Sequence, residues 1–261
     1  MLAERWGRVW AVARNDLRIL RADPAFLVIF TLMPLAFMAF TQGAYGTALS
    51  LAFPDADLNG AEQVVPGAAV LFSGFLVGNL GFGVFREHGW HTWERLRASR
   101  LSTPELLVGK AVTPVLSLAL QLTVMLGGGA LLFDLDVRGP VVALVAVASG
   151  LALVEVALGF MLLAVCRSVL QLNAATNIGA MFLGGLGGAV TPVSTLPEWA
   201  QTLAPFTPTY WAMTGFTDVI VDGAGITEIA RPLGILAAFV VGFTAVAALR
   251  FRVEDSKLSW A

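Results

Sequence analysis

Few residues in this sequence are placed to do chemistry, and the first of them is Glu155, an acid within a long apolar stretch. A charged side chain at the centre of a bilayer costs at least about 2.5 kcal/mol, so it faces protein or water and not lipid. Glu155 therefore belongs either to a substrate path or proton relay, or to a neutral or paired contact between helices. The same two alternatives, pathway or helix packing, hold for Asn79, Gln121 and Asn177.

The sequence lacks the residues that a metal site or a nucleotide-binding site needs. Glu87, His88 and His91 could approach one metal ion, but the chain holds only 2 histidines, so we do not expect a metal site. The segment Gly109-Lys110-Ala111 is not a phosphate-binding loop, because no glycine precedes it at the required spacing and alanine replaces the residue that would hold magnesium. With no clustered Ser, His and Asp residues, we expect no catalytic or cofactor-binding residue in this chain. The net charge of -2 gives no reason to expect a nucleic-acid partner.

The elements that position these residues are predicted to be helices that cross a membrane. Of 261 residues, 57% are hydrophobic and 13% are charged, whereas soluble domains carry roughly 25% charged residues. The apolar runs are continuous and do not alternate with the period of a membrane barrel, which favours helices. Since about 20 residues cross the hydrocarbon core, we predict an all-α membrane protein with six spans, near residues 25–45, 66–85, 111–133, 141–165, 172–190 and 231–250.

An amphipathic helix is predicted before the first span, over residues 1–23. Arginines occupy most of its circumference, and its apolar side is formed by Trp6, Trp10, Ala13, Leu17 and Leu20. Such a helix lies flat at the cytoplasmic interface, with its arginines near anionic headgroups. The alternative is a solvated helix that packs on another protein. Asp23-Pro24 ends the helix, because proline disfavours helical geometry in the residue before it.

The distribution of basic residues predicts the orientation in the membrane, because Lys and Arg of short loops stay on the cytoplasmic side. All of the 16 basic residues except Arg138 and Arg231 fall in segments that are inside if the N-terminus is inside. The opposite loops gather nine of the 18 acidic residues and only two basic ones. We therefore expect both termini to be cytoplasmic and the chain to lie in a plasma membrane.

The segment of residues 86–105 between the second and third spans is too polar to cross a membrane and too short to fold alone. From Thr92 to Arg100 it can be helical, with Trp93 and Leu96 on one side and charged side chains left for a partner. A helix held between two spans suits the transmission of force, because a partner that presses on it moves both spans. Alternatively, it only anchors the loop through its tryptophans.

This segment resembles the corresponding segment of the ABC type-2 exporter permeases, in both the drug-exporter and the polysaccharide or lipooligosaccharide branches. The resemblance rests on Glu87, Thr92, Glu94-Arg95-Leu96, Leu101-Ser102 and Gly109-Lys110. His91 and Arg100 depart from the family, which often has glycine and proline there. In the family the segment is a coupling helix that docks into the ATP-binding subunit. The resemblance therefore implies an ATPase contact formed by Glu87, Thr92, Trp93, Glu94, Arg95, Leu96 and Arg97.

The outer segment of residues 191–230 contains Pro192, Pro197, Pro205 and Pro208, which break any continuous helix. Its aromatic residues favour the headgroup level. Half-helices that dip into the membrane fit this pattern, as does a capped surface loop with an aromatic belt. The pattern also resembles the re-entrant hairpin that closes the outer side of the pathway in this family. That resemblance implies an outer gate formed by Pro197, Trp199, Pro208 and Tyr210. A short outer helix with Met213, Phe216, Val219 and Ile220 on its apolar side is expected to follow.

Taken over residues 1–261, the resemblance implies a single permease domain that exports an amphiphilic drug or lipid-like molecule across a bacterial inner membrane. A separate subunit would bind ATP and magnesium, and a second permease chain, identical or different, would complete the pathway within the lipid bilayer. Export of a lipid-linked saccharide is an alternative cargo. The main rival is a secondary transporter driven by protons through Glu155.

Overall fold

The computed structural model describes residues 2–52, 58–90, 92–99 and 101–251. Side-chain surroundings are described for most but not all of these residues. The described chain is helical, and its elements are α1 (Leu2–Ala22), α2 (Ala25–Ala52), α3 (Ala61–Gly89), α4 (Thr92–Arg97), α5 (Thr103–Leu132), α6 (Val141–Val165), α7 (Val169–Leu186), η1 (Val193–Thr195), α8 (Glu198–Leu203), η2 (Ala204–Phe206), α9 (Pro208–Ile220) and α10 (Ala230–Arg250).

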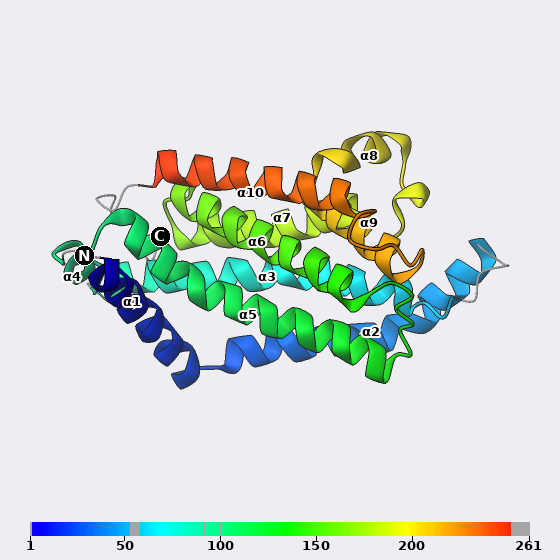
Figure 1. Cartoon of the computed structure of the whole chain (residues 1–261), viewed down its shortest axis with the longest axis horizontal. Helices are drawn as coiled ribbons and strands as arrows, with labels where there is room; N and C mark the ends of the chain where they lie inside the picture. Colours follow the sequence, from blue (N-terminus) through cyan, green and yellow to red (C-terminus); the bar gives the residue numbers. More distant parts are fainter. Residues whose placement is uncertain (1, 53–57, 91, 100, 252–261) are drawn as a thin grey trace.

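Six of these helices, α2, α3, α5, α6, α7 and α10, are long and apolar enough to cross a membrane. They run side by side as one elongated bundle (Figure 1). One end of the bundle, here called the α4 end, holds α1, α4 and the last turn of α10. The opposite end, here called the α8 end, holds α8 and the beginning of α10. The predicted all-helical class and the six spans are therefore confirmed.

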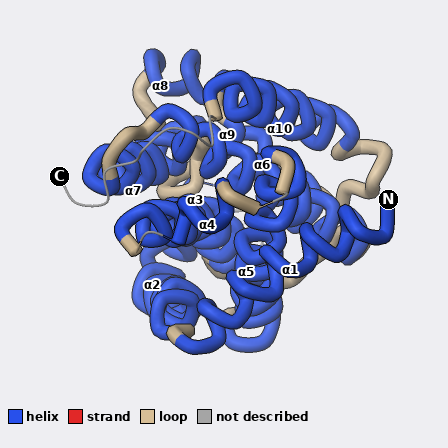
Figure 2. The backbone as a smooth tube through the Cα atoms, turned by 90° about the vertical axis from the view of Figure 1, so that its left-hand side faces the viewer, coloured by secondary structure: helices blue, strands red, loops and turns tan. Residues whose placement is uncertain are grey.

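Helix α3 lies at the centre of the bundle when it is viewed along its length (Figure 2). In the most apolar stretch of α3, 79% of the residues are buried, whereas the share is 17% in the corresponding stretches of α2 and α10. Small residues let its neighbours approach closely, as is usual between membrane helices. A Cβ at Gly67 would lie 2.1 Å from the carbonyl oxygen of Ala189, and a Cβ at Gly78 would lie 2.5 Å from the Cβ of Thr176. Side chains at these glycines would push α7 and its following turn away from α3.

The fifth span ends earlier than the predicted residues 172–190, because α7 stops at Leu186. Gly188 follows in the left-handed region, with a φ of 87°, which glycine adopts at little cost. Thr209 of α9 occupies the space beside Gly187 and donates a hydrogen bond from its hydroxyl to the carbonyl of Leu183. The last turn of α7 is thus closed by α9, a segment that is distant in sequence.

The N-terminal helix was expected to have one apolar side, and the structure divides that side in two. Ala13 is buried with Val12 where α1 packs on α5. Trp6 and Trp10 instead remain 66% and 58% exposed. Packing on α5 takes the residues nearest Gly109 and leaves the two indole rings for a membrane interface.

The outer segment folds into short pieces, as its prolines predict. Trp211 fixes the turn before α9 by donating from its Nε1 to the carbonyl of Pro205, at 2.8 Å. Helix α9 then packs on α6 and α10. The apolar side predicted for it is confirmed, since its buried residues include Met213, Phe216, Val219 and Ile220.

A break in the hydrogen bonding of α2 is repaired by α5. Pro34 has no backbone N–H, so the carbonyl of Phe30, four residues earlier, loses its partner within the helix. The Nε2 group of Gln121 donates to that carbonyl at 2.8 Å, and to the carbonyl of Phe72 in α3 at 3.2 Å. Gln121 is fully buried. Of the two roles open for this residue, the structure supports the packing of helices.

Replacing Gln121 with leucine is expected to lower the free energy of unfolding by about 1–3 kcal/mol, because it leaves the Phe30 carbonyl buried without a donor. Restoring a backbone N–H with Pro34→Ala in the same chain should recover part of that loss. Thr123→Val on the same helix is the control and should change stability by less than about 0.5 kcal/mol, since its hydroxyl bonds only to its own helix. Denaturant unfolding in detergent compares the wild type, Gln121→Leu, Pro34→Ala, the double variant and the Thr123→Val control. Strictly additive effects of the Gln121 and Pro34 changes would contradict this role.

Candidate functional site

The segment between the second and third spans is held against the bundle by one buried tryptophan. Trp93 of α4 is 4% exposed, and its ring lies edge-on to Phe251, with 6.3 Å between the ring centroids. Both belong to a hydrophobic cluster, the α4-end cluster, which gathers residues from the ends of most long helices: Val12, Val84, Phe85, Trp93, Leu106, Leu163, Cys166, Leu172 and Phe251. Helix α4 packs on α3 and, through Trp93, joins a cluster that also contains residues of α1, α5, α6 and α7.

The outward side of α4 carries charge. Glu94 and Arg95 are exposed, while Leu96 is half-buried beside the α4-end cluster. This agrees with the predicted division of the helix into an anchoring and an outward side. Thr92 and Arg97 begin and end α4, and their side chains lie outside the described part of the structure.

Lys110 forms the centre of a buried ion cluster at the base of this segment. Its Nζ lies 2.5 Å from the Oε1 of Glu87 in α3 and 3.0 Å from the Oδ1 of Asp16 in α1. The side chains of Lys110 and Glu87 are each only 9% exposed. Removing one partner of such a buried ion pair strongly destabilises the folded protein, because the remaining charge is left uncompensated. Lys110 of α5 thus ties together α1, α3 and α5.

A second ion pair joins α1 to the beginning of α5. Glu105 accepts from the guanidinium of Arg8 at 2.7 Å and from the backbone N–H of Ser102 at 2.9 Å. The hydrogen bond from Arg8 to Glu105 also raises the pKa of Arg8 above its usual value. Gly109 of α5 lets α1 approach closely enough for this ion pair, since a Cβ at Gly109 would lie 2.8 Å from the Cβ of Val12.

These contacts correct part of the predicted ATPase contact. Glu87 and Trp93 are 7% and 4% exposed, so their side chains are not accessible to a partner in this structure and instead hold the segment in place. Sequence reasoning missed Asp16, because its contact with Lys110 joins residues that are 94 positions apart. The signal that could have found it is a lone acid within the arginine-rich part of α1.

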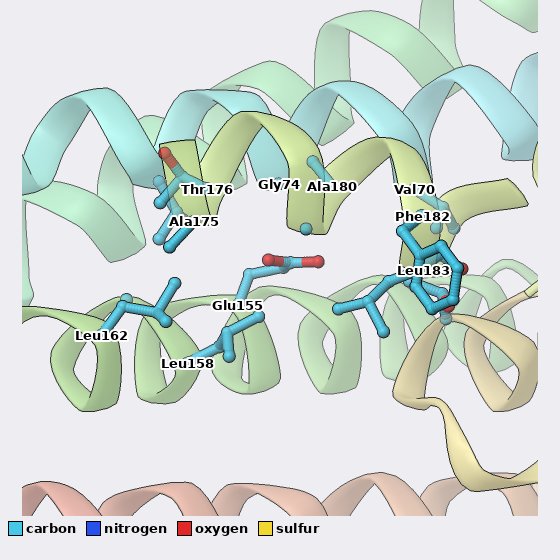
Figure 3. Close-up of a pocket in the computed structure, with 14 residues that line it drawn as sticks. Val70, Gly74, Glu155, Leu158, Leu162, Ala175, Thr176, Ala180, Phe182 and Leu183 are labelled. Carbon is cyan, nitrogen blue, oxygen red and sulfur yellow. The ribbon is translucent and has the colours of Figure 1, made fainter. Parts of the chain in front are cut away.

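The polar residues within the spans differ in their surroundings. Asn177 is half-buried and donates from its Nδ2 to the carbonyl of Asn173 in its own helix, at 2.9 Å. Asn79 lies within α3, and its side chain lies outside the described part. Glu155 is 4% exposed and faces a cavity between α6 and α7 (Figure 3). The cavity measures about 270 Å³.

The four residues predicted to form an outer gate are divided between α8 and α9 and differ in exposure. Trp199 is 59% exposed on α8, and Pro197 caps the start of that helix. Pro208 is buried at the first position of α9, after the cap formed by Thr207. Tyr210 is half-buried and lies edge-on to Trp211, with 5.2 Å between the ring centroids. The structure thus separates an exposed pair on α8 from a packed pair on α9.

The side chains of His88 and His91 lie outside the described part of the structure. Among the described residues there is no group of three His, Cys, Asp or Glu side chains that could hold a metal ion. The expectation that Glu87, His88 and His91 do not form a metal site therefore still rests on the sequence.

Two comparisons relate this chain to known proteins. Residues 46–249 match a family model described as ABC-2 family transporter protein. The chain is also 31% identical over 147 residues to the Linearmycin resistance permease protein LnrN of Bacillus subtilis (strain 168). That alignment covers 56% of this chain and 38% of the relative, so the chain spans well under half of the relative's length. The family match includes α4, Lys110 and Glu155.

Replacing Lys110 with methionine is expected to lower the free energy of unfolding by about 3–5 kcal/mol, because it leaves Glu87 buried without its cation. The change should also expose α1 to protease, since one of its three ion pairs with α5 is lost. Arg14→Met, at an exposed position of α1, is the control and should leave both measurements near the wild type. Unfolding in detergent and limited proteolysis measure the two effects. A Lys110→Met chain that equals the wild type in both would show that the cluster does not hold α1.

Proposed function

Because the chain belongs to the ABC-2 family of transporter proteins, we propose that it is the membrane-embedded permease subunit of an ATP-driven exporter. The observation that carries this proposal is α4, a short helix that is fixed to the bundle on one side and presents charge on the other. It lies between the second and third of six helices that are long enough to span a membrane. The whole of residues 1–261 would act as one permease domain.

A separate ATP-binding subunit is proposed to dock on Glu94 and Arg95, with Thr92, Leu96 and Arg97 beside them. That subunit would bind the ATP and magnesium. Its movement would reach the spans because α4 does not move alone. Trp93 holds α4 in the α4-end cluster, and Lys110 joins α1, α3 and α5. The docked helix and these three elements would therefore shift together.

The proposed orientation puts the α4 end in the cytoplasm of a bacterium and the α8 end outside. Arginines of α1 and the charges of α4 lie at the α4 end, which agrees with the retention of basic residues on the cytoplasmic side. A second permease chain would face this one across the pathway. Pro197, Trp199, Pro208 and Tyr210 would close that pathway on the outside, with the exposed Trp199 at its mouth.

The proposed cargo is an amphiphilic drug or a lipid-like molecule. The relative is named as a linearmycin resistance permease, and a role in resistance favours a drug as the cargo of this chain over a lipid-linked saccharide. A proton-coupled secondary transporter remains a second candidate, because Glu155 is a buried acid that faces a cavity. The two candidates differ in whether an ATPase is required.

Replacing Glu94 and Arg95 together with alanine is expected to abolish assembly with the ATP-binding subunit, because both side chains are exposed on the proposed docking side. The fold should persist, since neither side chain is buried. Co-purification of the ATPase with the tagged permease measures assembly, and unfolding in detergent measures the fold. Glu198→Ala with Arg138→Ala removes an acid and a base away from α4 and should leave assembly intact.

Two results would count against the proposal. Normal assembly of the double variant at Glu94 and Arg95 would contradict the docking surface. A tagged wild-type chain that brings no ATPase with it, yet transports in a proton-dependent manner, would favour the secondary transporter.

A further inference from the structure

The cavity beside Glu155 is lined mostly by apolar side chains, with Glu155 as its one ionisable residue. It lies among α3, α6 and α7, and its largest apolar side chains are Val70, Val77, Leu158, Leu162, Phe182 and Leu183. Figure 3 shows the carboxyl group of Glu155 extending from α6 into the space in front of α7. Gly74 of α3 lies beside it, since a Cβ at Gly74 would be in ordinary van der Waals contact with the Oε2 of Glu155, at 3.7 Å.

The protein itself offers this carboxyl group no partner within the described residues. Glu155 has no hydrogen bond or ion pair there. The two hydroxyl groups that line the cavity are already used as donors. Thr176 donates to the carbonyl of Leu172 in its own helix, and Thr209 donates to the carbonyl of Leu183. A buried carboxylate without a cation or donor is costly, so the empty cavity favours the neutral acid, and a ligand that brings a cation favours release of the proton and the ionised form.

The shape of the cavity indicates how such a ligand lies. Its volume of about 270 Å³ is slightly below the roughly 300–1,000 Å³ of sites that enclose a drug-sized molecule. It therefore holds one part of a longer molecule. Phe182, at its edge on α7, is 56% exposed. The remainder of the ligand can leave the cavity past this ring, along the apolar outer side of α7.

We propose that this cavity binds an amphiphile that carries a protonated amine, with the amine on the Glu155 carboxylate and the apolar body along α7. The apolar walls bind the hydrocarbon part of the ligand, and the single acid binds its protonated amine. A neutral molecule of the same shape would fill the walls but leave the acid without a partner. The inference rests on the proposed export function, of which it names the substrate class.

The test compares two photoreactive probes of the same length, a dodecylamine and a dodecanol that each carry a diazirine and an alkyne. Each is cross-linked to the full-length chain in phosphatidylcholine nanodiscs, without any ATPase subunit, and the labelled peptides are identified by mass spectrometry. We expect the amine to label α6 and α7 about tenfold more than the alcohol, because an ammonium group neutralises the buried carboxylate whereas a hydroxyl group does not.

Three variants assign the effect to this cavity. Glu155→Gln keeps the size of the side chain and should reduce amine labelling to the level of the alcohol. Thr176 lines the same cavity, but its hydroxyl group donates to a carbonyl of its own helix. The amine preference should therefore persist in Thr176→Val. Gly179→Leu should reduce labelling by both probes severalfold, since a Cβ at Gly179 would meet nothing within 4 Å and the larger side chain obstructs the cavity.

Adding phosphatidylethanolamine to the nanodiscs identifies the source of the amine. Competition by this lipid would identify a lipid headgroup as the occupant, and undiminished labelling would identify a free amphiphilic amine. Equal labelling of α6 and α7 by both probes in the wild type would overturn the proposal, as would an amine preference that survives Glu155→Gln. The wild-type comparison needs no variant to fold. Because no ATPase is present, its outcome is also independent of the assembly test of the exporter function.

Discussion

The contact on which the α4 end depends is the burial of one ammonium group between two carboxylates. Lys110 of α5 lies between Glu87 of α3 and Asp16 of α1. Charges in such surroundings are stable only while each has its partner, because the protein interior solvates them poorly. The hydrophobic contacts of Trp93 are non-directional, so the ion cluster fixes the relative position of the three helices while the α4-end cluster holds them together. A helix as short as α4 has little stability of its own, and its position is set by these surroundings.

Close approach of backbones is the second constraint, and it creates the cavity as well as the core. Glycines of α3 admit α7 at Gly78, while a Cβ at Gly159 of α6 would lie 2.4 Å from Val77. Between these tight contacts the helices cannot fill every space, because Gly74 and Gly179 offer no side chain there. Glu155 projects into the space that is left. The acid is thus held by well-packed neighbours on both sides, although nothing in the described protein neutralises it.

The sequence was sufficient for the features that depend on local composition. The bounds predicted for the fourth span are those of α6, residues 141–165, because charged or helix-breaking residues flank an apolar run in which Glu155 is the one charged residue. The early end of α7 was not predictable in this way, since it depends on Thr209 of a distant helix. Nor was the role of Gln121, which replaces a donor lost at Pro34 in another helix. Composition reveals which residues are unusual, but only the packing of helices shows what each one contacts.

The length of α7 has a consequence for the surrounding lipid. Its 18 residues rise only about 27 Å, which is less than the roughly 30 Å of hydrocarbon that a span must cross. Helix α5, with 30 residues, has length to spare. A short helix next to long ones draws the two leaflets toward each other locally, at a modest cost per ångström of mismatch. We therefore expect the bilayer to be thinner along α7 than along α5, with shorter acyl chains beside the short helix.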